Sequence, residues 1–282
     1  MKRKFVEEHI ANLFMFLSTM LVIGLFGGIV WVIVRTGWPS LTWEMVSSLP
    51  GGGFYLGKDG GILNAIVGSL LIVSMSTILG LCLSLPIVFY MNVYLAQGSR
   101  LASYARLCFD VLFGIPSIVY GAFAFTLMIF FGLKTSLLGG VIVTTLLIIP
   151  IFVRSMDEVA RSVPHDLFDA LYSLGTTRFE ACFVVLRQIF PGIITATLLS
   201  IGRAIGDAAG VLFTAGFTDN IPTSLGEPAA TLPLSVFFQL SSPIPEVREK
   251  AFAAALLLTL IVLFLSITGR VITTRFSKHR IK

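Results

Sequence analysis

The chain has 282 residues, of which 56% are hydrophobic and only 12% are charged, and its net charge is +5. Soluble domains carry about 25% charged residues, so this composition excludes an ordinary soluble protein and indicates a membrane protein. Lipid offers no partners for unpaired backbone groups, and the apolar runs lack the alternation of a membrane β-barrel. We therefore expect an all-α polytopic fold, and we read the positive charge as topology rather than as a nucleic-acid surface.

Six apolar runs approach or exceed the roughly 20 residues that a helix needs to cross a bilayer. In chain order they cover residues 13–34, 62–86, 107–131, 137–156, 189–214 and 251–271. Pro86 is expected to kink the second span, which then continues to Tyr94. The first run is too long for a signal peptide and no small-residue cleavage site follows it, so it is expected to stay attached. The sequence shows no repeats and no soluble domain, and it predicts a single transmembrane domain over residues 1–282.

The distribution of basic residues predicts the orientation of these spans. Six spans place both termini on one side of the membrane. That side carries 14 of the 20 lysines and arginines, the other side carries five, and Arg203 lies inside a span. The positive-inside rule then predicts that both termini and the polar segment 157–191 are cytoplasmic.

This polar segment, between the fourth and fifth spans, is predicted to form two short helices joined by a sharp turn. Ser162 is placed to cap a helix whose first turn contains Pro164, and Gly175 is expected to end it. A capping box from Thr177 to Glu180 begins the second helix. Leucines recur at helical spacing along the first helix, at positions Leu167, Leu171 and Leu174. The alternative is an amphipathic loop that lies on the lipid surface.

The same segment carries a family signature. Asp169-Ala170-Leu171, then Gly175, and later Ile189 and Pro191 resemble the EAA motif of ABC-importer permeases. Asp169 replaces the usual Glu and Leu171 the second Ala, which keeps the negative charge and the apolar character. In that family the short helix docks in a cleft of a cytoplasmic ATPase and transmits its motion to the membrane. The resemblance implies that the ATPase is contacted by Leu167, Asp169, Ala170, Leu171, Leu174 and Gly175.

Arg203 and Asp207 stand out in the fifth span. They are four residues apart, so in a helix they can pair on one face. A mid-span arginine costs about 2.5–3.5 kcal/mol even on the lenient insertion scale, and such residues normally face a bundle interior or a water-filled path. Small residues beside the pair recur every four positions and would allow a neighbouring helix to approach closely, at Gly202, Gly206, Gly210 and Thr214.

Two interpretations of this pair remain open at this point. It can be a neutralised structural pair. Alternatively, Arg203 can bind an anion in transit while Asp207 weakens that binding enough for release. The planar guanidinium suits tetrahedral oxyanions, but the chemistry alone does not separate phosphate from sulfate or molybdate.

The third span contains Pro116, which frees a backbone carbonyl and bends the helix; Ser117 is expected to compensate for part of that loss. A packing kink and a gating or path-lining role are both open for this proline. Asp110 is read as structural, because a carboxylate is favourable near the amino end of a helix.

Three segments resemble the phosphate-specific (Pst) permeases within the ABC-importer family. They are Arg203–Asp207, similar to Arg-Ala-x-Gly-Glu; Gly114–Gly121, similar to Gly-(Ile/Val)-Pro-Ser-Ile-Val-Tyr-Gly; and Ser162–Arg178, similar to the coupling region. Asp207-Ala208 stands where Glu-Thr is usual. The resemblance implies a type I importer permease fold (MetI-like), with core helices over 62–271, a coupling region at 157–191, and Arg203, Asp207 and Ser117 along the substrate path. Leu232-Pro233-Leu234 and the Ala-rich last span favour the A-type subunit over its C-type partner.

The resemblance implies a permease subunit of a phosphate importer in a prokaryotic inner membrane. Its partners would be a homologous permease, two ATPase subunits inside, an extracytoplasmic phosphate-binding protein and membrane lipid. The chain has no G-x-x-x-x-G-K-[ST] loop, so ATP hydrolysis would lie in the partner. No cofactor or metal site is expected, since the cysteines have no ligand spacing. The alternatives are a permease for another oxyanion, a stand-alone secondary transporter, and a membrane enzyme.

Overall fold

The computed structural model describes residues 2–51, 54–56, 60–96 and 98–276, and all regular secondary structure in this part of the chain is helical, with no strand. Lys58, Lys278, Arg280 and Lys282, which entered the charge count, lie outside the described residues. The helices are α1 (Lys2–Gly37), α2 (Trp43–Ser47), α3 (Leu63–Phe89), α4 (Arg100–Gly114), α5 (Ser117–Phe130), α6 (Leu137–Arg161), α7 (His165–Ser173), α8 (Arg178–Ile205), α9 (Leu232–Leu240) and α10 (Pro245–Phe276), with a 3-10 turn η1 (Phe54–Leu56) and a π-helical turn η2 (Tyr90–Tyr94).

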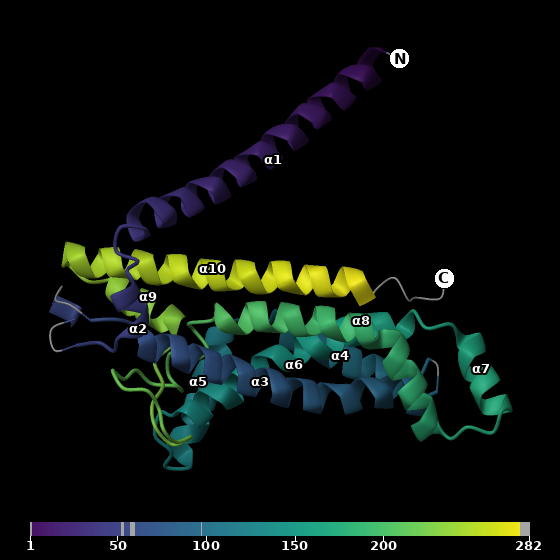
Figure 1. The fold of residues 1–282 in the computed structure, drawn as a ribbon. Coiled ribbons are helices and arrows are strands. Elements are labelled where there is room, and N and C mark those ends of the chain that lie inside the picture. The colour runs from purple at the N-terminus through teal and green to yellow at the C-terminus, as the bar shows by residue number, and fades with distance from the viewer. Residues whose placement is uncertain (1, 52–53, 57–59, 97, 277–282) are drawn as a thin grey trace.

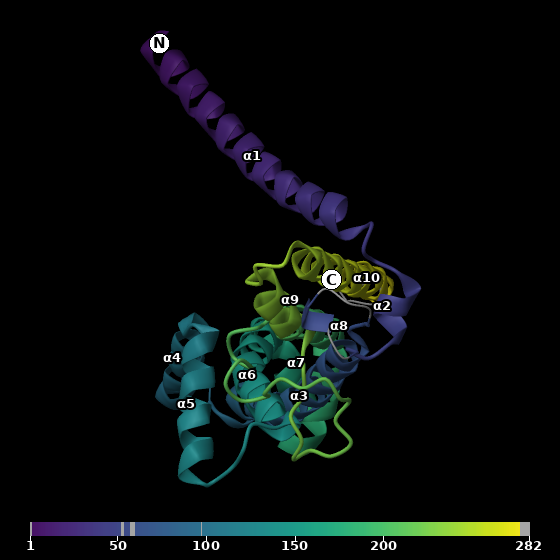
Figure 2. The same cartoon turned by 90° about the vertical axis from the view of Figure 1, so that its left-hand side faces the viewer.

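Four long helices, α3, α6, α8 and α10, run side by side and form the body of the molecule (Figure 1). The largest core cluster lies among α3, η2, α6 and α8, and α6 contributes Ile148, Phe152 and Met156, all fully buried. The pair α4 and α5 lies to one side of this body, and α1 stands away from it, in contact with α10 near Gly37 (Figure 2). The short helix α7 lies beyond one end of the body, which we call the α7 end (Figure 1).

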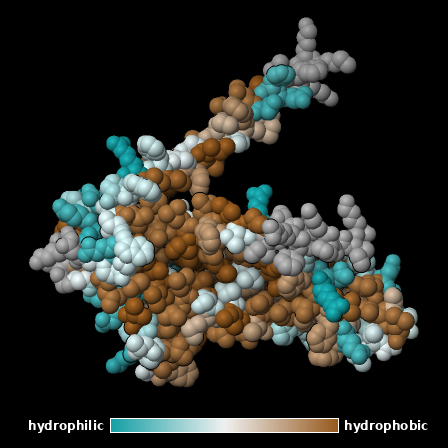
Figure 3. All heavy atoms as spheres, viewed as in Figure 1, coloured by the Kyte–Doolittle hydropathy of each residue, from teal (hydrophilic) through white to brown (hydrophobic). Residues whose placement is uncertain are grey.

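Among the described residues, five helices are long and apolar enough to cross a membrane, and the pair α4 and α5 makes a sixth if it is counted as one broken span. The second span runs from Leu63 to Tyr94 with Pro86 inside it, as predicted. The amino end of α1 and the carboxyl end of α10 both point toward the α7 end (Figure 1). Apolar residues cover the middle of the body, and polar residues gather mainly toward its two ends (Figure 3), as in a protein that spans a bilayer.

The third span is broken rather than kinked, because α4 and α5 meet at an angle of 97°. Pro116 has no N–H to offer to the carbonyl of Leu112, four residues earlier. That carbonyl accepts instead from the hydroxyl of Tyr120, at 2.8 Å, and from the amide of Ile115, at 3.2 Å. Ser117 was predicted to compensate for the lost bond; the tyrosine does so, because the sharp bend brings the first turn of α5 back beside the last turn of α4.

Two other predicted boundaries were wrong. The fourth span continues as α6 to Arg161, so Asp157 is a buried helical residue and not the start of a polar loop. The second short helix is continuous with the fifth span, and α8 ends at Ile205, with Gly206 as its carboxyl cap. The fifth span therefore stops well before residue 214.

The irregular segment 207–231 is held by bonds to the far end of the body from α7. The amide of Asn64 donates to the Thr218 carbonyl at 2.6 Å, and the hydroxyl of Tyr55 donates to the Asp219 carboxylate at 2.9 Å. Burial, followed by the neighbouring Asp219, raises the pKa of Tyr55, so this hydroxyl stays a donor at physiological pH. These ties position the turn after α8.

Candidate functional site: a basic cavity and a protruding helix corner

The corner between α7 and α8 has the local structure that the sequence predicts. Gly175 has φ +79°, and the amides of Gly175 and Thr176 donate to the carbonyls of Tyr172 and Leu171, at 3.0 and 3.2 Å. This is the Schellman arrangement, in which a glycine in the left-handed region ends the helix. The capping box of Thr177 and Glu180 then starts α8, with both reciprocal bonds formed.

The leucine stripe of α7 is split between two environments. Leu167 and Leu171 are half-buried and pack against the main core, whereas the side chain of Leu174 is 81% exposed. Asp169 and Ala170 are also exposed. The helix therefore anchors to its own subunit with one face and presents the other to solvent, which leaves Leu174 as an apolar group with nothing to cover it.

Ser162 does not cap α7, contrary to the prediction. Its hydroxyl donates to the Val159 carbonyl at 2.7 Å, at the end of α6, and Pro164 occupies the cap position of α7 without a side-chain bond. The serine bonds to the end of α6 rather than to the start of α7, because α6 extends further than expected.

The predicted pair of Arg203 and Asp207 is not formed. Because α8 ends at Ile205, the two residues no longer share a helix face. The carboxylate of Asp207 instead accepts a bond from the Gly210 amide at 2.8 Å and closes a turn. In the described part of the chain, the guanidinium of Arg203 has no carboxylate partner.

Within the described part of this chain, no neighbouring helix packs against the strip of small residues on α8. A Cβ atom added to Gly202 would meet nothing within 4 Å, and Gly210 lies beyond the end of the helix. Gly121 on α5 permits a close approach to the turn after α8, since its added Cβ would lie 2.6 Å from the Gly210 carbonyl oxygen. The first turns of α5 and the turn that follows α8 are thus in close backbone contact.

Arg203 lines a cavity of about 410 Å³ between α6, α8 and the end of α4. The described residues around it are Leu112, Phe113, Leu147, Ile151, Arg154, Ser155, Glu158, Leu199 and Arg203. Ser117 and Asp207 are not in this lining; the carbonyl oxygen of Ser117 lies instead 3.6 Å from where a Cβ on Gly210 would be. Of the three predicted path residues, the structure brings only Arg203 to the cavity and places the other two at the turn beside α5.

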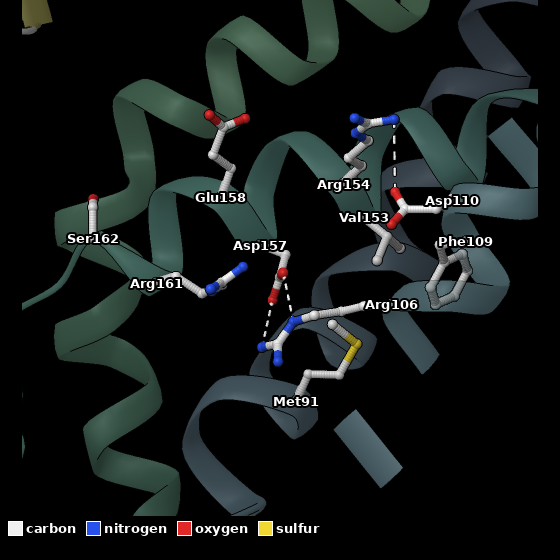
Figure 4. Close-up of a pocket in the computed structure, with 10 residues that line it drawn as sticks. All are labelled: Met91, Arg106, Phe109, Asp110, Val153, Arg154, Asp157, Glu158, Arg161 and Ser162. Carbon is white, nitrogen blue, oxygen red and sulfur yellow. Dashed lines mark hydrogen bonds and ion pairs between the residues drawn. The ribbon is translucent and has the colours of Figure 1, made fainter. Parts of the chain in front are cut away.

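A second cavity, of about 570 Å³, lies next along α6 toward the α7 end. Its described lining is Met91, Arg106, Phe109, Asp110, Val153, Arg154, Asp157, Glu158, Arg161 and Ser162 (Figure 4). Arg154 belongs to both cavities. Its guanidinium lies 5.0 Å from the ring centroid of Phe113 and 3.6 Å from the Asp110 carboxylate. Both partners of that ion pair are more than half exposed, so the pair is weak and exchangeable.

The two cavities differ in charge. The first combines two guanidinium groups, Arg154 and Arg203, with one carboxylate, Glu158. The second combines three arginines with three acidic residues. An anion would therefore be attracted to the first cavity and held less strongly in the second.

Sequence reasoning missed Arg154, which it counted only as a charge near the membrane surface. A signal was present, because Leu147, Ile151 and Arg154 recur at helical spacing and put the arginine on one face of α6. In the described residues no group of three or more His, Cys, Asp or Glu side chains could hold a metal ion.

Residues 84–281 match the family described as "Binding-protein-dependent transport system inner membrane component". The phosphate transport system permease protein PstA of Pasteurella multocida is 33% identical over 92% of this chain and 94% of its own length. The PstA of Yersinia pestis is 37% identical over 78% of this chain and 74% of its own. The predicted likeness to phosphate-specific permeases of the A type is thereby confirmed.

A chain from a structure of the MetNI methionine ABC transporter superimposes with a TM-score of 0.61, covering 76% of this chain and 95% of that one. The sequence identity is only 16%, so this match concerns the fold alone. It confirms the predicted MetI-like importer fold.

Proposed function

Because the chain belongs to the family of binding-protein-dependent transport system inner membrane components, we propose that it is a permease subunit of an ATP-driven importer for inorganic phosphate. The names of its PstA relatives support phosphate as the substrate. The subunit forms part of the translocation path and does not hydrolyse ATP itself.

The observation that carries this proposal is the shared lining of the 410 Å³ cavity by Arg154 and Arg203. A guanidinium inside a span is costly, and a bound oxyanion offsets that cost by accepting charge-assisted hydrogen bonds in the planar fork geometry. Arg203 is available for such a ligand because its predicted carboxylate partner faces Gly210. Asp207 and Ser117 act on the path indirectly, by shaping the turn that packs against α5.

Arg154 stands between the two cavities and contacts the anion next. As the anion passes Phe113, the guanidinium of Arg154 leaves the Asp110 carboxylate and binds the anion instead. The second cavity has balanced charge, so the anion is released from it toward the α7 end.

The α7–α8 corner receives motion from a cytoplasmic ATPase. Leu174 enters an apolar cleft of that partner, Asp169 and Ala170 lie at its rim, and Gly175 supplies the sharp helix end. Leu167 and Leu171 anchor the same helix to the main core, so displacement of α7 moves α8.

The excess of basic residues on the terminal side supports a cytoplasmic location for both termini and for the α7 end. The complete importer pairs this chain with a homologous permease, two ATPase subunits, and a phosphate-binding protein on the opposite side. The membrane lipid covers the apolar band of Figure 3. No nucleic acid takes part.

Reconstitution of the complete importer in vesicles tests the proposal. The variant Arg203→Gln should lose about 10- to 100-fold of ATP-dependent phosphate uptake, since a charge-assisted hydrogen bond is worth about 1.5–3 kcal/mol. Arg100→Gln is the control, because Arg100 is exposed and lines neither cavity. Undiminished uptake by the Arg203 variant would refute the path, and sulfate or molybdate uptake in place of phosphate would refute the substrate.

A further inference from the structure

The π-helical turn η2 joins α3 to the parts of the molecule that surround the cavities. The amide of Leu95 donates to the Tyr90 carbonyl at 3.0 Å, a step of five residues. Such turns are rare and occur frequently at functional sites. Within it Met91 and Val93 are buried, and the side chain between them, Asn92, is half-buried and faces α6.

Asn92 belongs to a polar cluster that joins three elements. Its amide donates to the Asp157 carboxylate at 2.8 Å and to the Val88 carbonyl at 3.0 Å, and its carbonyl oxygen accepts from Arg106 at 3.3 Å. Arg106 in turn donates to both oxygens of Asp157, at 2.8 and 3.1 Å (Figure 4).

Asp157 is only 6% exposed. A buried carboxylate with a bidentate arginine has few alternative arrangements, because separating the two leaves a buried charge unpaired. The cluster thus holds η2, α4 and α6 together as one unit.

The other side of η2 contacts the α7–α8 corner. The guanidinium of Arg178 donates to the carbonyl of Tyr94, the last residue of the turn. Arg178 is the first residue of α8 and lies three residues after Gly175. The turn η2 is therefore bonded to the α7–α8 corner through its last residue, Tyr94, and to the polar cluster through Asn92, two residues earlier.

The cluster also lies close to the groups that line both cavities. Along α4, Asp110 and Phe113 follow Arg106 by about one and two helical turns. Along α6, Arg154 precedes Asp157 by three residues and so lies on the neighbouring part of the same face.

We infer that Asn92 is a positioning residue for transport, which keeps α4 and α6 in register with the α7–α8 corner. Displacement of the corner pulls on η2 through Arg178, and Asn92 transmits it to Asp157 and Arg106. The movement then reaches Phe113 and Arg154 between the cavities. This inference rests on the proposed function, because it describes how that function is coupled.

The ratio of ATP hydrolysed to phosphate transported tests the inference in the complete reconstituted importer. Asn92→Leu preserves the shape of the side chain and removes its hydrogen bonds. The ratio should rise about fivefold, as expected for loss of one coupling contact, while hydrolysis per assembled complex is retained. An unchanged ratio would overturn the inference.

Ser76→Ala is the matched control. Ser76 is a fully buried residue in the middle of α3 that lines neither cavity, and its hydroxyl donates to a backbone carbonyl, that of Ile72, at 2.6 Å. Both variants lose hydrogen bonds that are shielded from solvent, so both lower the stability of the subunit. Only the Asn92 variant should raise the ratio; an equal rise in both would mean a general effect of destabilisation and would contradict the inference.

Asn92→Asp covers the case in which the leucine variant assembles poorly. It keeps the size of the side chain and places a second carboxylate beside Asp157, which should also raise the ratio; tight coupling in this variant would reject the role of Asn92.

The tests of wild type and of Arg203→Gln separate the two proposals. If these behave as proposed while both Asn92 variants stay coupled, only the inference about η2 fails.

Discussion

At the scale of single residues, Gly121 and Gly202 show how differently two glycines in apolar helices are constrained. A Cβ on Gly121 would lie 2.6 Å from the Gly210 carbonyl oxygen and 3.0 Å from that of Ala209. Both neighbours are backbone atoms, so neither can rotate away. A Cβ on Gly202 would meet nothing within 4 Å.

Gly121→Ala should therefore destabilise the subunit by about 1–3 kcal/mol, the usual cost of overpacking. Gly202→Ala should be neutral or slightly stabilising, because alanine favours a helix. Thermal unfolding of the purified importer in detergent measures the difference. Equal midpoints for the two variants would show that α5 does not depend on this contact.

At the scale of elements, the broken span α4–α5 and the α7–α8 corner show two ways to end a helix. Proline removes one donor at the break, and the Tyr120 hydroxyl donates to the freed Leu112 carbonyl together with the Ile115 amide. At the corner the backbone itself turns, with Gly175 in the left-handed region. The first device needs a partner from the following helix, whereas the second needs only a residue without a Cβ.

Gly175→Val should impair the corner, because the left-handed conformation costs a residue with a Cβ about 1–2 kcal/mol, and more for a branched one. We expect phosphate uptake to fall while assembly of the two permeases is preserved. Gly132→Val is the control: Gly132 has φ +67°, an added Cβ there also meets nothing within 4 Å, and it lies in the turn between α5 and α6. Uptake and ATP hydrolysis by the two variants, measured side by side, check the prediction, which would fail if both lost uptake equally.

At the scale of the whole molecule, the proposed orientation in the membrane rests on the distribution of charge, and the fold predicts which residues are accessible from each side. Leu174 at the α7 end and Leu133 in the α5–α6 turn are 81% and 58% exposed. Leu133 precedes the amino end of α6 and Leu174 lies beyond its carboxyl end. The proposed orientation therefore puts the two leucines on opposite sides of the bilayer.

Single cysteines at these two leucines test that arrangement, in a chain whose native Cys82, Cys108 and Cys182 have been replaced by alanine. Before the ATPase is added, a membrane-impermeant maleimide should label Leu174→Cys only from the cytoplasmic side and Leu133→Cys only from the other. Labelling of both from one side would exclude the orientation.

The sequence by itself determined the helical class, the second span through Pro86, the Gly175 stop and the Thr177–Glu180 cap. These features depend on neighbouring residues and on the solvent, so local periodicity and capping chemistry are sufficient to predict them. The sequence alone also showed that the motif segments resemble those of phosphate-specific permeases.

Only the tertiary structure decided where the charged groups meet. Spacing predicted a pair between Arg203 and Asp207, but α8 ends between them because the following segment is bonded to α3 and α6. The bidentate contact of Arg106 with Asp157 joins residues 51 positions apart, and Arg154 shares a cavity with Arg203 across two helices. Such contacts depend on how the helices pack against one another. The local periodicity of a single sequence does not predict that packing.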